Sequence, residues 1–339
     1  MAPARGLQTQ TSTPRPGTRP RRTCTTRRLC ARPGTPTPAP HLAAHTDLHG
    51  TTDCRENNAM PLLQRIVQTG RRVFPRGWSF ALRRIAKLHP SLQTYPATLA
   101  SGDTLHVNLA EDMCHGYFYH GRLEHEQYAE ELFKLVLRPG GCAYDIGANI
   151  GYFTRVLSKI VGNNGRIRAF EPMPSALRLL RINTADLSNV IIHDLAVTDN
   201  NGVAPFAVRA HGDTSSLGES KDGSLQINVD TVRLDDLRPI DENVSLIKID
   251  VEGYELEVLK GATKVIASCR PILYFEFIPA YATRRGIRLD DFENLLRPLG
   301  YELRWINPQF PYGPLVSLTP SSYLIAARGE AWPDLFNVT

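Results

Sequence analysis

Four carboxylates gather at one point of the sequence, at the end of an apolar run. The stretch LIKIDVEGYELEVLKGA (246–262) carries, within eight residues, Asp250, Glu252, Glu255 and Glu257. The run before Asp250 has the composition of a buried strand, and the residues after Gly253 have the spacing of a helix. Acidic residues in a first helical turn complement the helix dipole, which accounts for Glu255 and Glu257. Asp250 and Glu252 precede the helix, so they are the pair available for chemistry.

A second group of candidate residues follows another apolar run, in CAYDIGANIGYFTRVL (142–157). The pattern predicts a strand that ends at Asp145, a glycine-rich turn and a helix that begins near Ile150. Gly147 and Gly151 have no Cβ, so we expect a ligand to approach the backbone there. The pattern D-x-G-x-N-x-G differs from the G-x-G-x-x-G of dinucleotide sites, whose helix faces a pyrophosphate. A carboxylate before the turn suits a cationic ligand such as the sulfonium of S-adenosylmethionine (SAM).

The ends of the next two predicted strands carry further polar residues. GRIRAFEPMP (165–174) ends its strand at Glu171, 26 residues after Asp145. An acidic side chain at this position can bind both hydroxyls of an adenosine ribose, in NAD sites and in SAM sites alike. Pro172 then stops the strand. The third strand ends in IIHDLAVTD, where Asp194, Leu195 and Ala196 are candidates for the edge of an adenine ring.

The elements that must position these residues alternate between strands and helices. From residue 141 onward the pattern predicts an α/β fold with a mostly parallel, seven-stranded sheet and helices on both faces. Between 194 and 244 the chain has the character of a strand-rich insertion. The predicted strands are 141–146, 166–170, 190–193, 245–250, 271–277, 301–306 and 322–327. The predicted helices lie near 150–161, 174–186, 254–260 and 289–297.

Topology ranks the candidate catalytic residues. In a doubly wound sheet, ligands bind beyond the carboxyl ends of the strands, where the strand order reverses. The strands that end at Asp145 and Asp250 are expected to flank that point, which makes Asp250 the first candidate for a general base. Glu252 is the second, and Glu276, at the end of PILYFEF, is the third, unless it is only a surface carboxylate. Asp250 and Glu252 can begin a metal site, but the sequence shows no third ligand, so no metal is predicted.

Four motifs, in their order and spacing, resemble the FkbM-type family of SAM-dependent methyltransferases: DIGANIGYFT, AFEPMP, VDTVRLDDL and IKIDVEGYELEVLKGA. The resemblance covers roughly 115–330. It implies a Rossmann-like class I methyltransferase fold, SAM as the cofactor, and O-methylation of a hydroxyl on a sugar, glycolipid or polyketide-type natural product. The residues that the resemblance and the motifs assign to SAM are Glu124, Asp145, Gly147, Ala148, Asn149, Gly151, Glu171, Pro172, Asp194 and Ala196.

Other functions stay open at this point. A NAD-binding Rossmann oxidoreductase would also use Glu171, although the G-x-G-x-x-G motif is missing. A non-catalytic SAM-binding protein would share the fold. A nucleic-acid methyltransferase is disfavoured, because DVEG (250–253) stands where an Asn/Asp-Pro-Pro-aromatic signature would follow the fourth strand. Residues 61–339 also hold 30 basic and 31 acidic residues, whereas nucleic-acid enzymes carry a broad basic face.

The N-terminal residues differ in composition. Residues 1–59 contain eight prolines and are rich in Arg and Thr, which predicts a disordered tail, or a translation start at Met60. Residues 60–114 are expected to form a basic helical and extended cap in front of a domain at 115–330. In 61–89 apolar residues recur at helical spacing beside seven basic residues and no acidic one. Such helices can lie on an anionic membrane surface or pack on the domain, and we favour the packing.

Composition sets the expected compartment and partners. The six cysteines form no CxxC pair, which indicates thiols in a reducing compartment. No apolar run approaches the roughly 18–20 residues of a membrane span. We therefore expect a cytoplasmic protein, with at most a peripheral contact at the inner membrane face, a small-molecule or glycoconjugate acceptor and no nucleic-acid partner.

Overall fold

The computed structural model describes residues 62–73, 78–123, 126–209, 215–218, 225–237, 243–306 and 322–331. All of them belong to one compact unit that extends from Glu56 to Thr339. The predictions for the tail 1–59 and for Glu124 lie outside the described residues. The unit contains a seven-stranded sheet, a four-stranded sheet and an N-terminal segment of helices with a short hairpin.

The seven-stranded sheet has the order β12-β13-β11-β10-β3-β4-β5, and only β13 runs opposite to its neighbours. This confirms the mostly parallel sheet, and the order is that of the class I methyltransferase fold. Each strand lies within one residue of its predicted limits. Their bounds are β3 (Cys142–Ile146), β4 (Arg166–Phe170), β5 (Val190–His193), β10 (Val244–Ile249), β11 (Ile272–Phe277), β12 (Tyr301–Trp305) and β13 (Ser322–Arg328).

The strand order reverses between β3 and β10, as predicted. The chain leaves β3 toward β4 and β5 and later returns to the other side of β3 as β10. In this parallel pair Asp145 lies opposite Lys248, and Ile146 lies opposite Ile249. The pairing extends past the strand, because the N–H of Asp250 donates to the carbonyl of Ile146 at 2.9 Å. Asp145 and Asp250 therefore sit at the carboxyl ends of the two strands that flank the reversal.

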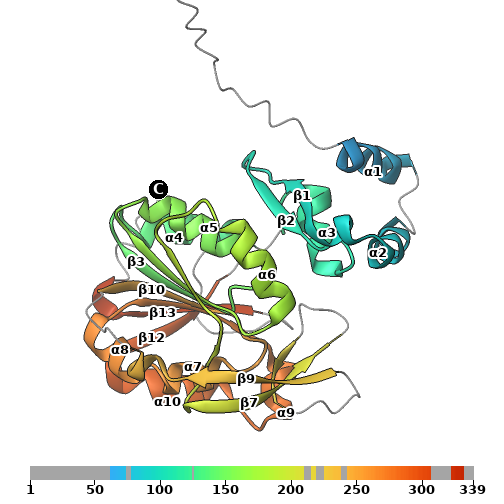
Figure 1. Ribbon diagram of the computed structural model, residues 1–339. Helices are drawn as coiled ribbons and strands as arrows, with labels where there is room; N and C mark the ends of the chain where they lie inside the picture. Colours follow the sequence, from blue (N-terminus) through green and yellow to red (C-terminus); the bar gives the residue numbers. More distant parts are fainter. Residues whose placement is uncertain are drawn as a thin grey trace, which may run out of the picture. The chain divides into compact units, whose positions relative to one another are not determined.

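Both faces of this sheet are buried, because its strands have apolar residues at successive positions. Ala143, Leu246 and Tyr274 belong to one cluster, whereas Tyr144 and Ile247 belong to another. One face is covered by α4 (Glu126–Val136), α5 (Tyr152–Val161) and α6 (Pro174–Asn183), and the other by α7 (Glu255–Lys260), α8 (Thr263–Cys269) and α10 (Leu289–Leu296) (Figure 1). Of these helices, α4 and α8 were not predicted, and neither was a further short helix, α9 (Pro279–Arg284).

The insertion folds as its own sheet, in agreement with the strand-rich character of 194–244. Its order is β6-β9-β7-β8. A 3₁₀ turn after β9 ties it to the main domain, since the buried Asp235 carboxylate accepts the N–H groups of Lys264 and Val265 at the start of α8. The strands are β6 (Ala196–Val197), β7 (Gly202–Val208), β8 (Ser216–Leu217) and β9 (Leu225–Val232).

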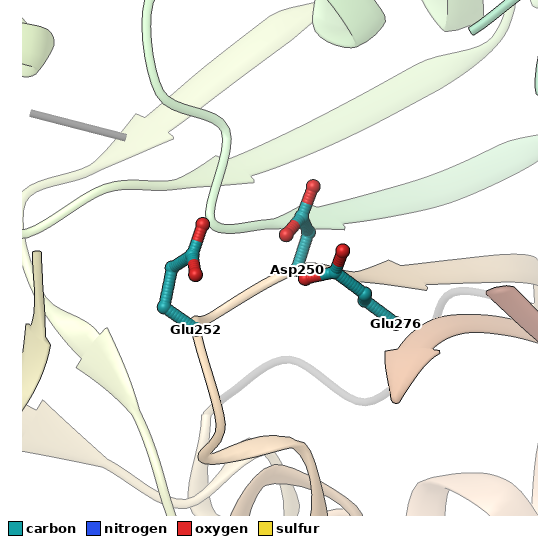
Figure 2. Close-up of side chains that lie close together, drawn as sticks. All are labelled: Asp250, Glu252 and Glu276. Carbon is teal, nitrogen blue, oxygen red and sulfur yellow. The ribbon is translucent and has the colours of Figure 1, made fainter. Parts of the chain in front are cut away.

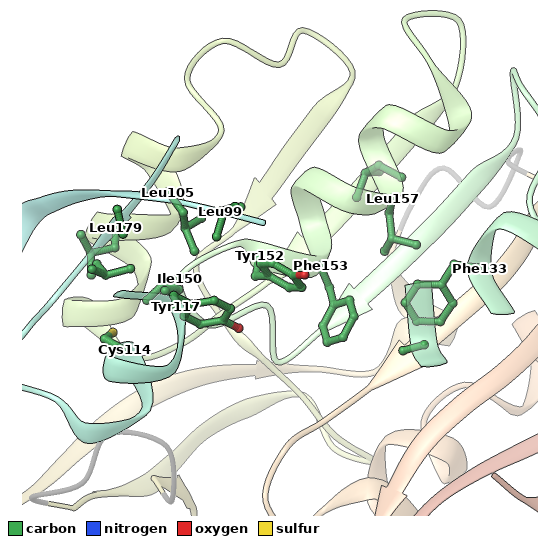
Figure 3. Packing of buried hydrophobic residues seen from close by; sticks show 14 of the residues in the cluster. Leu99, Leu105, Cys114, Tyr117, Phe133, Ile150, Tyr152, Phe153, Leu157 and Leu179 are labelled. Carbon is green, nitrogen blue, oxygen red and sulfur yellow. The ribbon is translucent and has the colours of Figure 1, made fainter. Parts of the chain in front are cut away.

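The N-terminal segment packs on the face of the sheet that α5 and α6 cover. Val67 and Leu82 join the hydrophobic cluster that reaches Phe153 and Leu157 of α5, part of which Figure 3 shows. Asn183, at the end of α6, pairs with both backbone groups of His106. The elements are α1 (Leu62–Val73), α2 (Trp78–Leu88), the 3₁₀ turn Pro90–Thr94, β1 (Tyr95–Thr98), β2 (Thr104–Val107) and α3 (Asp112–His120). The boundary expected at 114/115 falls inside α3.

The turn after β3 depends on a glycine. Gly147 has a φ of 76°, and a Cβ on it would lie 1.8 Å from the carbonyl oxygen of Asp250. We predict that Gly147→Ala lowers the free energy of unfolding by at least ~4 kcal/mol, because the collision adds to the backbone strain. Gly140→Ala is the matched control: its φ is 81° and no atom lies within 4 Å, so about 1–2 kcal/mol is expected. Urea unfolding measures both, and equal losses would contradict the collision.

Candidate active site

A cavity of about 350 Å³ lies at the carboxyl ends of β3, β4, β10 and β11. This is where the reversal of strand order predicts a ligand site, and its volume is in the range of small-molecule pockets. The insertion contributes β8 and the residues at β6 to its wall, and α3 contributes side chains from the N-terminal segment. The lining includes the predicted residues Gly147, Ala148, Asn149, Glu171, Pro172, Ala196, Asp250, Glu252 and Glu276.

Glu171 holds the turn after β3 against the end of β4. One oxygen of its buried carboxylate accepts the N–H of Asn149 at 2.8 Å, and the other accepts the N–H of Met173 at 2.8 Å. Asn149 can meet it because its φ is 50°, in the left-handed region that Asn tolerates. Burial raises the pKa of Glu171 to about 7, against the two hydrogen bonds and the charge of Lys248, which lower it. The carboxyl therefore changes charge near neutral pH.

The two glycines of the turn have a role that the sequence did not suggest. We expected Gly147 and Gly151 to leave room for a ligand, but protein atoms occupy the space that a Cβ would take. That space holds the Asp250 carbonyl at Gly147, and at Gly151 it holds the Leu180 side chain, 2.8 Å away. Gly151 is not part of the cavity lining. The glycines thus let β10 and α6 approach the turn closely.

Asp145 lies beneath the cavity rather than in its wall. Its carboxylate is fully buried, accepts the hydroxyl of Thr154 at 2.6 Å and lies 3.3 Å from the Lys248 ammonium. Lys248 also lies 3.5 Å from the Asp250 carboxylate and donates to the carbonyl of Gly147 at 3.1 Å. The cation expected next to Asp145 is thus supplied by the protein itself.

Lys248 remains charged although it is buried. Burial alone would lower its pKa, but the facing carboxylates of Asp145 and Asp250 outweigh it and raise the pKa to about 12. Its ammonium also lies 5.3 Å from the centre of the Phe153 ring. Lys248 was not among the residues predicted for the site. The signal was a lone charge inside the apolar run LIKID, two positions before Asp250 and hence on the same side of the strand.

Three carboxylates converge at the end of β10 and β11 (Figure 2). Asp250, Glu252 and Glu276 each place an oxygen within 4.8 Å of the other two. Glu276 is the penultimate residue of β11, opposite Tyr323 of β13, and is more than nine-tenths buried. The sequence showed no third oxygen ligand beside Asp250 and Glu252, and the structure brings Glu276 to that position.

The loop that carries Asp250 and Glu252 is fixed from below by Glu255. This side chain is buried, and its carboxylate accepts the N–H groups of Val251 at 3.2 Å and Gly253 at 3.1 Å. Glu252 has a φ of 57° and Gly253 a φ of 97°, so two consecutive left-handed residues turn the chain into α7. Glu255 is therefore more than a charge at a helix start, whereas Glu257 pairs with Arg285 at 2.8 Å.

The structure places one predicted residue outside the cavity lining and two residues that were not predicted inside it. Asp194 is exposed and pairs with Arg181 at 3.3 Å, outside the cavity lining, while its neighbours Leu195 and Ala196 belong to the lining. Met113 and Tyr117 of α3 also line the cavity, and the Met113 sulfur lies 3.6 Å from the Asn149 amide. No motif pointed to these two, because α3 lies upstream of the motif region.

Comparison with known proteins bears on this site. Residues 145–303 match the profile of the Methyltransferase FkbM domain, and they include the end of β3, the whole insertion and the carboxylate cluster. This part of the chain is similar to an FkbM methyltransferase domain. The cofactor of such a domain is S-adenosylmethionine. The matched region ends in β12 and leaves out the N-terminal segment and β13.

Relatives of the FkbM domain carry names that mention sugar and O-methylation. The chain is 26% identical over 166 residues to the 2-O-methyltransferase NoeI of Sinorhizobium fredii, covering 43% of this chain and 67% of that one. It is 30% identical over 128 residues to the hexuronic acid methyltransferase AglP of Haloferax volcanii, covering 37% and 51%. Across the curated relatives it matches, the chain spans from about half to two thirds of their length.

A solved structure of an FkbM methyltransferase is similar as well. A methyltransferase FkbM from Methylobacillus flagellatus shares 22% identity, with 63% of this chain and 52% of that chain covered and a TM-score of 0.37. The strand order of the seven-stranded sheet identifies the fold independently of this similarity. The residues of the cavity fit SAM. The buried carboxylate of Glu171, with a pKa of about 7, lines the cavity and can accept the ribose hydroxyls. The apolar side chains of Phe170, Leu195 and Val197 can enclose an adenine ring.

The buried charges beneath the cavity give a stability prediction. Lys248→Met should lower the free energy of unfolding by about 3–5 kcal/mol, because it leaves the Asp145 carboxylate buried without its cation. The double variant Lys248→Met/Asp145→Asn should regain part of that loss. Lys159→Met removes a half-exposed ammonium that pairs with Asp103, and should cost no more than about 1 kcal/mol. Denaturant unfolding measures all three, and equal losses for Lys248→Met and Lys159→Met would contradict the prediction.

Proposed function

We propose that this protein is a SAM-dependent O-methyltransferase that transfers a methyl group to a hydroxyl of a sugar, glycolipid or natural-product acceptor. One observation carries the proposal. A single cavity is lined both by the turn after β3 with Glu171 and by three converging carboxylates, Asp250, Glu252 and Glu276. The cavity therefore offers a nucleoside-binding wall and a proton-accepting wall to two ligands at once.

The cofactor is assigned to the wall formed by β3, β4 and β6. In this proposal the two hydroxyls of the ribose donate to the ionised Glu171 carboxylate, and Leu195 and Ala196 lie along the adenine. Ala148 and Asn149 present the backbone of the turn. Asp145 does not contact the cofactor in this proposal. It acts indirectly, by holding Lys248 in place beneath the turn. SAM supplies a methyl group on a sulfonium, activated for transfer to a nucleophile.

We assign Asp250 the role of the general base that accepts the proton of the acceptor hydroxyl. It follows the strand that flanks the reversal of strand order, and Glu255 and Lys248 fix its loop and its carboxylate. A positioned base of this kind contributes about 10²–10⁴-fold to a rate. Ionised carboxylates only accept hydrogen bonds, so Glu252 and Glu276 are suited to hold neighbouring hydroxyls of a polyhydroxylated acceptor.

We assign the carboxylates to the acceptor rather than to a metal. The ammonium of Lys248, 3.5 Å from Asp250, already balances part of their charge. Two aromatic side chains, Tyr281 and Tyr323, line the cavity on the same side as Glu276 and offer apolar faces to a sugar ring. The names of NoeI and AglP support an acceptor that carries sugar hydroxyls.

Loss of the base gives the direct test. We predict that the full-length protein transfers labelled methyl from SAM to a glycan or glycolipid fraction of a cell extract, with a chelator present. Asp250→Asn should lower this rate by about 10²–10⁴-fold and leave the SAM dissociation constant nearly unchanged. Asp290→Asn, which removes an exposed carboxylate on α10 that pairs with Arg288, should leave the rate unchanged. Full turnover by Asp250→Asn, loss of activity with the chelator, or binding of NAD without SAM would each contradict the proposal.

The charge of Glu171 gives a pH prediction. With a pKa of about 7 in the free protein, the carboxyl is mostly protonated at pH 6 and mostly ionised at pH 8. Since ribose hydroxyls favour the ionised form, SAM should bind close to tenfold more tightly at pH 8 than at pH 6, a total difference of about 1.4 kcal/mol in binding free energy. Isothermal titration calorimetry measures this slope.

Two variants separate Glu171 from its surroundings. Glu171→Gln should bind SAM weakly at both pH values and show no slope. Glu255→Gln is the matched control, because burial also raises the pKa of Glu255 to about 7, yet its carboxylate contacts the 250–254 loop instead of the cavity. The pH slope should persist in Glu255→Gln, and its disappearance there would show that Glu171 is not its source.

A further inference from the structure

Helices α1 and α2 expose an unusual amount of apolar side chain. Among the residues that the structure describes, nine large apolar side chains are exposed, and five of them lie on these two helices. Their exposed fractions range from 49% to 79%, far above what packing against the domain would leave. The five are Leu62 and Ile66 on α1, and Phe80, Ile85 and Leu88 on α2.

The opposite side of both helices is already used. Val67 of α1 and Leu82 and Ala86 of α2 are buried in the main hydrophobic cluster. Gln64 is also buried, and its amide donates to the carbonyl of Phe118 at 2.8 Å. The helices are thus anchored to the domain by one side, in line with the packing favoured from the sequence. A second apolar side remains, and the domain does not cover it.

Basic side chains accompany this second side. Arg65, Arg84 and Lys87 are exposed, and Phe80, Arg84 and Leu88 follow one another at intervals of four, which places them on one side of α2. The Arg84 guanidinium lies 5.6 Å from the centre of the Phe80 ring. Residues 62–88 contain seven basic and no acidic residues. The two helices therefore combine exposed apolar side chains with positive charge, and the nearby carboxylate of Asp112 on α3 is paired with Arg83 at 2.6 Å.

We propose that the exposed side of α1 and α2 is a docking surface for an anionic phospholipid membrane. Apolar side chains between Lys and Arg are the pattern by which amphipathic helices lie in a lipid headgroup layer. A second copy of this chain would bring the same positive charges face to face, and a nucleic acid would leave the apolar side chains in water. None of the described helices has the length and apolar character to cross a bilayer.

Vesicle binding tests the surface with the full-length protein. Sedimentation is compared between phosphatidylcholine vesicles and vesicles that also contain phosphatidylglycerol. The test variant is Phe80→Ser/Ile85→Ser/Leu88→Ser. The matched control is Val203→Ser/Leu225→Ser, which removes two apolar side chains that are 65% and 66% exposed on the four-stranded sheet. All replaced side chains are exposed, so thermal unfolding should stay near that of the wild type in both variants.

We expect the wild type to prefer the anionic vesicles, and the triple variant to lose about tenfold or more of its binding to them. The control variant should bind like the wild type. Because the Arg-rich residues 1–59 are present in every variant, binding through them would leave the triple variant unaffected and would overturn the proposal. Equal binding to both vesicle types would overturn it as well. The proposal would also be overturned if the wild type did not bind vesicles but formed a dimer or bound RNA, and if the triple variant abolished that dimer or that RNA binding.

Discussion

One buried ammonium group joins the parts of this domain that must meet at the cavity. Lys248 reaches the carboxylates of Asp145 and Asp250 and the carbonyl of Gly147, and so connects β3, β10 and the turn between β3 and α5. In a low-dielectric interior these charges stabilise one another only while all of them remain in place. The glycine at 147 is required for the same reason, since only a bare backbone lets the Asp250 carbonyl come this close. The cofactor wall and the acceptor wall thus depend on one set of contacts.

The fold could be predicted from the sequence because both faces of the sheet are buried. Continuous apolar runs such as the one before Asp250 have few alternatives to a central strand, and a Gly-rich turn or a proline marks where they end. The reversal of strand order then followed from the general topology of doubly wound sheets. Helix ends and short helices were less predictable. The helix expected at 174–186 ends at Asn183, where the Thr184 hydroxyl donates to the Leu180 carbonyl. The spacing of apolar residues does not predict a local hydrogen bond of this kind, so it does not fix where the helix ends.

The strand ends that carry the site residues could be predicted from the sequence, but the side chains that these residues contact could not. Sequence placed Asp145 beside a ligand, yet its partner is Lys248, because register in a parallel pair brings the two side chains together from positions 103 residues apart. Asp194 was expected at the adenine, and it points instead to Arg181, while Leu195 and Ala196 reach the lining. Glu276 was named on its own, and only tertiary structure shows that it meets Asp250 and Glu252. Glu255, taken for a helix-start charge, holds the loop of both.

The cavity is lined both by residues that match the family profile and by residues of α3, which lies outside the matched region. The residues that match the family profile begin at Asp145, whereas Met113 and Tyr117 come from a helix that ends 25 residues earlier. Two relatives could therefore agree at every motif and still differ in one wall of the pocket. Exchange of the segment upstream of β3 between relatives would alter the pocket without touching a motif. The shape of the pocket is then open to change through the segment upstream of β3 as well as by substitution in the core.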